Sequence, residues 1–75
     1  MNTAAKLFAA MQANPQGWRI EQLQTVARQH DIVWRHQGTS HCYFMRADGA
    51  VLSVPAHRPI KPAYVRMFID LVKGV

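Results

Sequence analysis

A change in the spacing of apolar residues at Ile32 most constrains what this chain can fold into. Before it, apolar residues recur every three or four positions; after it, β-branched and aromatic residues follow one another closely, as in strands. Three strands are predicted, at residues 32–36, 41–46 and 50–54. Residues 38–40 form one turn, and Asp48 and Gly49 are a two-residue hairpin signal. Pro55 ends the third strand because proline cannot donate to a β-ladder.

Helical spacing lies on both sides of these strands. A first helix begins with Thr3 as its N-cap and stops before Pro15, because proline disfavours the α conformation in the preceding residue. A second helix buries the apolar positions Ile20, Leu23, Val26 and Ala27. A third begins at Pro62 and ends near Gly74. The order α-α-β-β-β-α predicts an α+β fold, a three-stranded antiparallel meander with helices packed on one face and the other face open.

Length, charge and cysteine content narrow the class of protein. The 75 residues predict a single domain with a small core, and the net charge of +5 favours an acidic partner, nucleic acid first. The lone cysteine, Cys42, excludes an internal disulfide and offers no pair of thiolate ligands for zinc. No secretory signal and no apolar run long enough to span a bilayer is visible. Reducing cytoplasm is therefore the expected compartment.

Strand alternation assigns the side chains around the first turn to two faces. His41, Tyr43 and Met45 share one face of the second strand, while Cys42 and Phe44 share the other with Arg46. Phe44 and Cys42 are the better core residues, because a large aromatic side chain and a free thiol are both commonly buried. We therefore expect His41 on the open face or its rim. A register slip of one residue would reverse this assignment.

Two sequence motifs resemble those of a known family. GTSH at residues 38–41, followed by Phe44, resembles the glycine-serine-histidine motif of HicA toxins, which are small bacterial ribonucleases. VPAHRPIKP at residues 54–62, leading into YVRMF at 64–68, is similar to the ending of one branch of that family. The resemblance spans residues 18–75 and implies a fold like a double-stranded-RNA-binding domain. It also implies cleavage of messenger RNA and a HicB-type antitoxin protein that covers the site.

The resemblance places the family's catalytic histidine on His41 and its preceding glycine and serine on Gly38 and Ser40. Thr39 adds a residue to the simplest form of the motif. The chain also carries an additional N-terminal helix that shorter members of the family lack. The predicted protein is an mRNA interferase, the toxin of a type II toxin–antitoxin pair.

The residue types around His41 suit ribonucleolysis without a cofactor or metal. The reaction needs a base for the ribose 2′-hydroxyl, an acid for the 5′-oxygen and positive charge for the phosphorane, and histidine fills either proton role near neutral pH. His41 is the predicted catalytic residue. Amides and hydroxyls of the turn can hold phosphate oxygens, cations can neutralise phosphates, and a tyrosine can stack on a base. The predicted RNA-binding residues are Arg35, Gly38, Thr39, Ser40, Tyr43, Arg46, His57, Arg58 and Lys61.

Other interpretations of these residues stay open. His57 is the rival acid or base, although its proline-rich surroundings favour a structural role or a phosphate contact. His30 and His36 are expected at the surface, and a buried Cys42 thiol would be a poor nucleophile. The whole chain could instead be a non-catalytic RNA-binding module of the same fold that recognises A-form shape. It could also be an interaction domain whose basic face binds an acidic protein.

Overall fold

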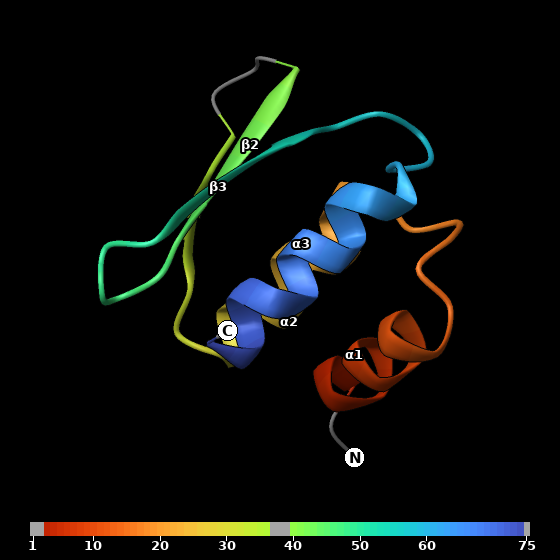
Figure 1. The fold of residues 1–75 in the computed structure, drawn as a ribbon, viewed down its shortest axis with the longest axis horizontal. Helices are drawn as coiled ribbons and strands as arrows, with labels where there is room; N and C mark the ends of the chain where they lie inside the picture. The colour runs from red at the N-terminus through yellow and green to blue at the C-terminus, as the bar shows by residue number, and fades with distance from the viewer. Residues whose placement is uncertain (1–2, 37–39, 75) are drawn as a thin grey trace.

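The computed structural model describes residues 3–36 and 40–74. Its elements follow the predicted order (Figure 1). They are α1 (Thr3–Ala13), α2 (Ile20–Gln29), β1 (Val33–Arg35), β2 (His41–Met45), β3 (Val51–Pro55) and α3 (Pro62–Lys73). None of the helices in these described ranges is long and apolar enough to cross a membrane. The predicted α+β class and element order are confirmed.

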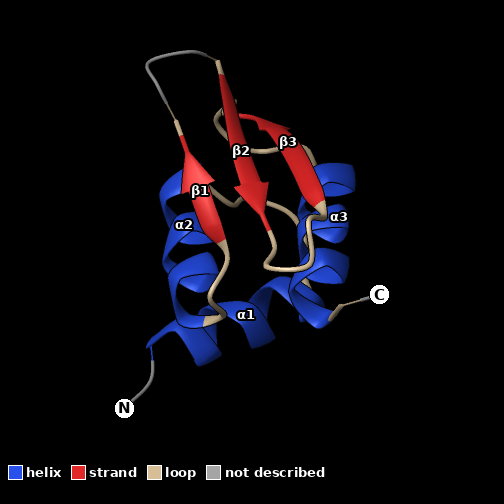
Figure 2. Ribbon diagram, turned by 90° about the vertical axis from the view of Figure 1, so that its left-hand side faces the viewer, coloured by secondary structure: helices blue, strands red, loops and turns tan. Residues whose placement is uncertain are grey.

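The sheet and the helices form two layers. The three strands are antiparallel with β2 in the centre. Figure 2 shows α2 and α3 side by side behind the sheet, with α1 crossing the lower end of the helical layer. One sheet face is therefore covered and the other is open, as the grouping of helices outside the strands predicts.

Residue alternation in β2 separates the core from the open face. Cys42 and Phe44 are completely buried, whereas His41 and Tyr43 are exposed. The Phe44 ring packs edge-on against Phe68 of α3, with 4.9 Å between ring centroids and an interplanar angle of 61°. Such tilted aromatic pairs are favourable beyond the area they bury. The predicted assignment of the two faces is confirmed.

The hairpin between β2 and β3 differs from the sequence prediction. Its loop has three residues, Ala47 to Gly49, because Arg46 N donates to Ala50 O (2.8 Å) and Gly49 N donates to Arg46 O (3.0 Å). Gly49 has a φ of +97°, while Asp48 does not reach positive φ. A type I turn closed by a left-handed glycine is the usual three-residue hairpin. The two-residue turn predicted from Asp48 and Gly49 is therefore wrong by one residue.

Pro55 is tolerated as the last residue of β3 because of its register. Ala56 N donates to Ser40 O (2.7 Å), and Arg46 N donates to Ala50 O at the other end of the pair. Hydrogen-bonded and non-hydrogen-bonded pairs alternate in an antiparallel ladder, so the pair of Pro55 and His41 falls at a non-hydrogen-bonded position. No backbone N–H is needed there, and the strand continues one residue further than predicted.

The ends of α3 follow the sequence prediction. Pro62 occupies the first turn, where its missing N–H has no intrahelical partner to lose. Gly74 closes the helix at a φ of +77°, and its N–H donates to the carbonyl of Leu71. The end of α2 is less expected, because Asp31 rather than a glycine adopts the left-handed conformation there, with a φ of +57°.

Candidate nucleic-acid interface

His41 lies where the open face meets one end of the sheet. It is the first residue of β2, it is exposed, and its partner across the ladder is Pro55. The Ser40 hydroxyl lies 3.2 Å from Nδ1 of the His41 ring, within hydrogen-bond distance. A contact of this kind favours ring orientations that direct Nε2 away from Ser40. The predicted catalytic histidine is thus accessible and stands beside the hydroxyl predicted with it.

The end of the sheet at which β2 begins and β3 ends is here termed the rim. It comprises Ser40, His41, Pro55 and the connector, residues 56–61. Two backbone hydrogen bonds hold the connector in place, one from Ala56 N to Ser40 O (2.7 Å) and one from Ile60 N to Trp18 O (2.8 Å). Ile60 is also completely buried. These anchors at both ends leave the connector little freedom to leave the sheet or the helices.

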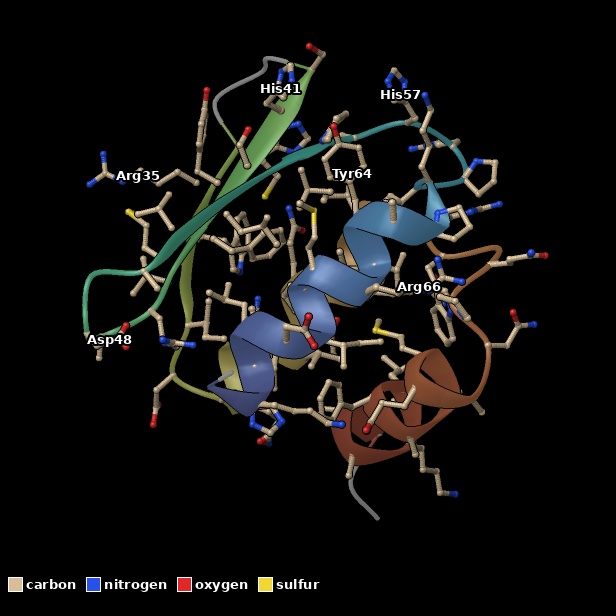
Figure 3. All side chains as sticks on the ribbon, viewed as in Figure 1. Arg35, His41, Asp48, His57, Tyr64 and Arg66 are labelled. Atoms are coloured by element: carbon tan, nitrogen blue, oxygen red, sulfur yellow. The ribbon has the colours of Figure 1, made fainter. Side chains whose placement is uncertain are left out.

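The connector presents its polar side chains to solvent. His57 and Arg58 are both exposed, and Figure 3 shows His41 and His57 along the same edge of the molecule. Arg58 forms an ion pair of 3.5 Å with Glu21 of α2. Both side chains of this pair are more than half exposed, so solvent screening makes it a weak attachment. A polyanion can therefore compete with Glu21 for the Arg58 guanidinium.

Lys61 adds a further cation where the connector meets α3. It is the exposed N-cap residue of that helix, and its carbonyl accepts the first backbone hydrogen bonds of the helix, from Tyr64 and Val65. Lys61 also lines a shallow, mostly apolar hollow of about 310 Å³, together with Pro59 and Pro62. Gln16 and Gly17 of the α1–α2 loop line the same hollow, so Lys61 lies where the connector meets that loop.

A row of side chains crosses the open face next to the rim. Arg35 of β1 lies directly opposite Tyr43 of β2, which in turn lies opposite Ser53 of β3. Tyr43 is 46% exposed, and Arg35 extends from the sheet away from the helices (Figure 3). A half-exposed ring beside a guanidinium can stack on a nucleobase while the cation contacts its phosphate. The structure thus brings Arg35 and Tyr43 together, two strand positions from His41.

Arg46, another predicted RNA-binding residue, lies at the end of β2 opposite to the rim. It follows the last residue of the strand, on the helical side of the sheet, and its Nη2 lies 2.6 Å from Asp48 Oδ2. Its Nε donates to Asp48 Oδ1 (2.9 Å) and its Nη1 to the Leu71 carbonyl (3.0 Å). These contacts tie the β2–β3 hairpin to the last turn of α3. A role in packing is thus the one its contacts support.

The paired groups at this hairpin perturb one another. The hydrogen bonds from Arg46, and then the backbone N–H of Ala50, lower the pKa of Asp48 to about 2. The same bond to Asp48 raises the pKa of Arg46. The sequence contained a signal for the ion pair between Arg46 and Asp48, since the arginine precedes the aspartate by two residues at the turn. Only the contact with Leu71, 25 residues away, could not have been inferred locally.

The remaining predicted residues lie as follows. Gly38 and Thr39 fall outside the described residues. His30 is exposed at the far end of α2, and its ring centroid lies 5.4 Å from that of Phe8. The Cys42 thiol is buried, and burial raises its pKa even though Gln24 Nε2 lies 3.6 Å from its sulfur. A thiol held in this way is a poor nucleophile.

Two members of the candidate site were not predicted from the sequence. Ser53 completes the row formed by Arg35 and Tyr43, and Glu21 of α2 forms the exposed ion pair with Arg58. Ser53 could have been found by applying strand alternation to the third strand once the register was known. Among the described residues, no group of three or more histidine, cysteine or acidic side chains is placed to hold a metal ion.

Comparison of the chain with protein-family models, with curated proteins and with solved structures gave no match. The functional interpretation therefore depends on the residues of the rim and the open face.

Proposed function

We propose that this chain is an endoribonuclease toxin of the HicA kind, which cleaves messenger RNA with His41 as a general acid or base. The observation that carries the proposal is the position of His41, exposed at the rim while its chain neighbour Cys42 is completely buried. A proton-transfer group must reach the substrate and yet be held on a rigid element. His41 meets both requirements, because it stands at the first position of the central strand.

The charge around His41 supports an RNA substrate. Arg35 on one side and Arg58 and Lys61 on the other lie at exposed positions. The chain carries nine lysine and arginine residues against four acidic ones. Two of those four, Asp48 and Glu21, are engaged with Arg46 and Arg58. A phosphodiester backbone laid along the rim and the open face would meet cations on both sides of the scissile bond.

The cellular setting follows from the proposed reaction. Messenger RNA places the enzyme in the cytoplasm, and a toxin of this class requires an acidic HicB-type antitoxin to hold it inactive. The excess of positive charge on the chain suits such a partner.

Replacement of His41 with glutamine tests the proposal. The exposed site should tolerate this change, so the thermal midpoint is expected to stay within about 3 °C of the parent, because surface substitutions rarely exceed about 0.5 kcal/mol. Cleavage of total RNA and growth arrest on expression should both disappear. His30→Gln is the matched control, since it removes another exposed histidine at the far end of α2. Undiminished cleavage by a folded His41→Gln protein would refute the assignment.

A non-catalytic RNA-binding module is the second candidate, and the row of Arg35, Tyr43 and Ser53 favours it. That row can bind RNA without any proton transfer. The two candidates differ in one measurement, the appearance of cleaved products when purified protein and RNA are mixed at concentrations that give full binding. Stable complexes with no products over hours would select the binding module.

A further inference from the structure

The proposed reaction needs two proton-transfer groups, and His41 is only one of them. A base removes the proton from the 2′-hydroxyl as the 2′-oxygen forms its bond to phosphorus. As the bond from phosphorus to the 5′-oxygen breaks, an acid gives that oxygen a proton. The products are a 2′,3′-cyclic phosphate and a 5′-hydroxyl. The second group must therefore lie on the opposite side of the phosphate from the first.

The described residues place a second histidine on the same rim. His57 is exposed on the connector, and Figure 3 places its side chain along the edge that carries His41. The hydrogen bond from Ala56 N to Ser40 O joins the residue before His57 to the residue before His41. This contact continues the β2–β3 ladder to the start of the connector, and so positions the backbone next to His57 relative to that of His41.

The register of β2 and β3 relates His41 and His57 to the same face of the sheet. His41 pairs with Pro55 on the open face, and the residue two positions beyond Pro55 is His57. In a continuing ladder these would be diagonal neighbours, with about 7–8 Å between them. The connector bends towards α3 at this point, and the imidazoles of His41 and His57 stand apart along the edge (Figure 3). Two groups that act on opposite sides of one phosphate must be separated in this way.

The charged groups around His57 suit a phosphate between the two rings. Arg58 and Lys61 lie on the same connector, and Glu21 of α2 is engaged with Arg58. Tyr64, half-buried in the first turn of α3, lies below the connector in Figure 3. Cations beside an acid–base pair stabilise the charge that develops on the phosphorane oxygens.

We propose that His57 is the second catalytic residue and completes with His41 an acid–base pair on opposite sides of the scissile phosphate. This inference depends on the proposed function, since it assigns the partner of His41 in that reaction. It gives His57 a role different from that of a simple phosphate contact. The difference can be measured, because a phosphate contact stabilises every substrate alike, whereas an acid matters only when the leaving group needs a proton.

The test uses two RNA substrates and four proteins. The first substrate is a single-stranded oligonucleotide that contains a cleavage site mapped on total RNA. The second is the same oligonucleotide with sulfur in place of the bridging 5′-oxygen at that site, because a thiolate leaves without protonation. The proteins are the parent, His41→Gln, His57→Gln and the control His30→Gln. Circular dichroism and the thermal midpoint verify that each variant is folded.

On the oxygen substrate, His57→Gln should lose a factor of about 10² to 10⁴ in single-turnover rate, the usual contribution of a general acid or base. On the sulfur substrate, the variant that lacks the acid should recover to within about tenfold of the parent, while the variant that lacks the base should stay slow. Recovery of His57→Gln assigns His57 as the acid and His41 as the base. Recovery of His41→Gln assigns the opposite roles, with His57 as the base. Either result supports the pair.

Three results would overturn the inference. His57→Gln could cleave the oxygen substrate within about threefold of the parent, or it could be slow while neither variant recovers on sulfur. Equal recovery of His41→Gln and His57→Gln on the sulfur substrate would also exclude one acid and one base. Failure of the proposed function itself looks different, because His41→Gln would then cleave the oxygen substrate as fast as His30→Gln.

Discussion

Tyr43 and Phe44 are adjacent in β2 but face opposite sides of the sheet, so substituting them should separate RNA binding from stability. Phe44 is completely buried against Phe68, whereas Tyr43 is 46% exposed on the open face. We consider Phe44→Leu, which removes the ring but keeps an apolar side chain, and Tyr43→Val, which keeps a good strand-forming residue.

The structure sets the size of each effect. Phe44→Leu loses the edge-on ring pair and part of the buried surface, together about 1–2 kcal/mol. A domain of this length has a total stability of about 4–11 kcal/mol. For so small a domain, 1 kcal/mol corresponds to about 4–8 °C, so the thermal midpoint should fall by about 4–16 °C. Tyr43→Val replaces a half-exposed ring whose cross-strand partners are Arg35 and Ser53, and should cost less than about 1 kcal/mol.

For RNA binding the order of the two variants should be reversed, with the larger loss in Tyr43→Val. Loss of one stacked base costs about 1–3 kcal/mol, which weakens the affinity of Tyr43→Val for single-stranded RNA by about 5- to 150-fold. Phe44→Leu should bind within about twofold of the parent at a temperature where both are folded. Catalytically inactive His41→Gln is the background for both, so that the RNA stays intact during the titration.

Urea denaturation followed by tryptophan fluorescence, together with fluorescence anisotropy of a labelled RNA, gives both quantities. Trp34 lies directly opposite Phe44 in the ladder and reports on the same region of the core. The reasoning fails if Tyr43→Val lowers the thermal midpoint as much as Phe44→Leu does. It also fails if Phe44→Leu weakens RNA binding as much as Tyr43→Val does.

Three further predictions concern the charged side chains. Arg58→Gln and Lys61→Gln should each reduce the slope of log affinity against log salt concentration by about 0.7, the value for one single-strand phosphate contact, whereas Arg28→Gln on α2 should leave it unchanged. Arg46→Gln should also leave the slope unchanged while it lowers the thermal midpoint, and a reduced slope would return Arg46 to the binding surface. Because the folded pKa of Asp48 is about 2, against an ordinary 3.8, its carboxylate stabilises the fold above about pH 4 and that stabilisation is lost as the pH falls towards 2. The thermal midpoint of Asp48→Asn should therefore change less than that of the parent between about pH 4 and pH 2. Parallel curves of thermal midpoint against pH for the parent and Asp48→Asn would contradict this role of Asp48.

Local sequence patterns predicted most of the fold. Helical spacing and β-branched runs are properties of neighbouring residues, so the element order and the burial of Phe44 followed without knowledge of distant contacts. The hairpin loop was the exception. Asp48 and Gly49 suit a two-residue turn, but the pairing of Arg46 with Ala50 requires three residues between them. Register, which depends on both strands together, decided the loop length.

The candidate site was predicted in part. Alternation alone put His41 on the open face, and the pairing of Arg35 with Tyr43 placed two more predicted residues beside each other. Arg46 carries the same charge as the other candidates, but it alternates with Cys42 and Phe44, and its contacts with Asp48 and Leu71 assign it to packing. The nearby Asp48 was visible in the sequence, but the hydrogen bond from Arg46 to the Leu71 carbonyl joins residues 25 positions apart and depends on the packing of α3.

By itself, the sequence determined an α+β domain with a basic excess and an accessible histidine at the start of the central strand. These features depend on composition and on periodicities of two and 3.6 residues, which act over a few neighbouring positions. Only the tertiary structure decided which cations share the rim with His41 and that His57 lies along the same edge. The hydrogen bonds from Ala56 to Ser40 and from Ile60 to Trp18 produce that arrangement. Contacts across such distances in the chain form only when the whole core packs.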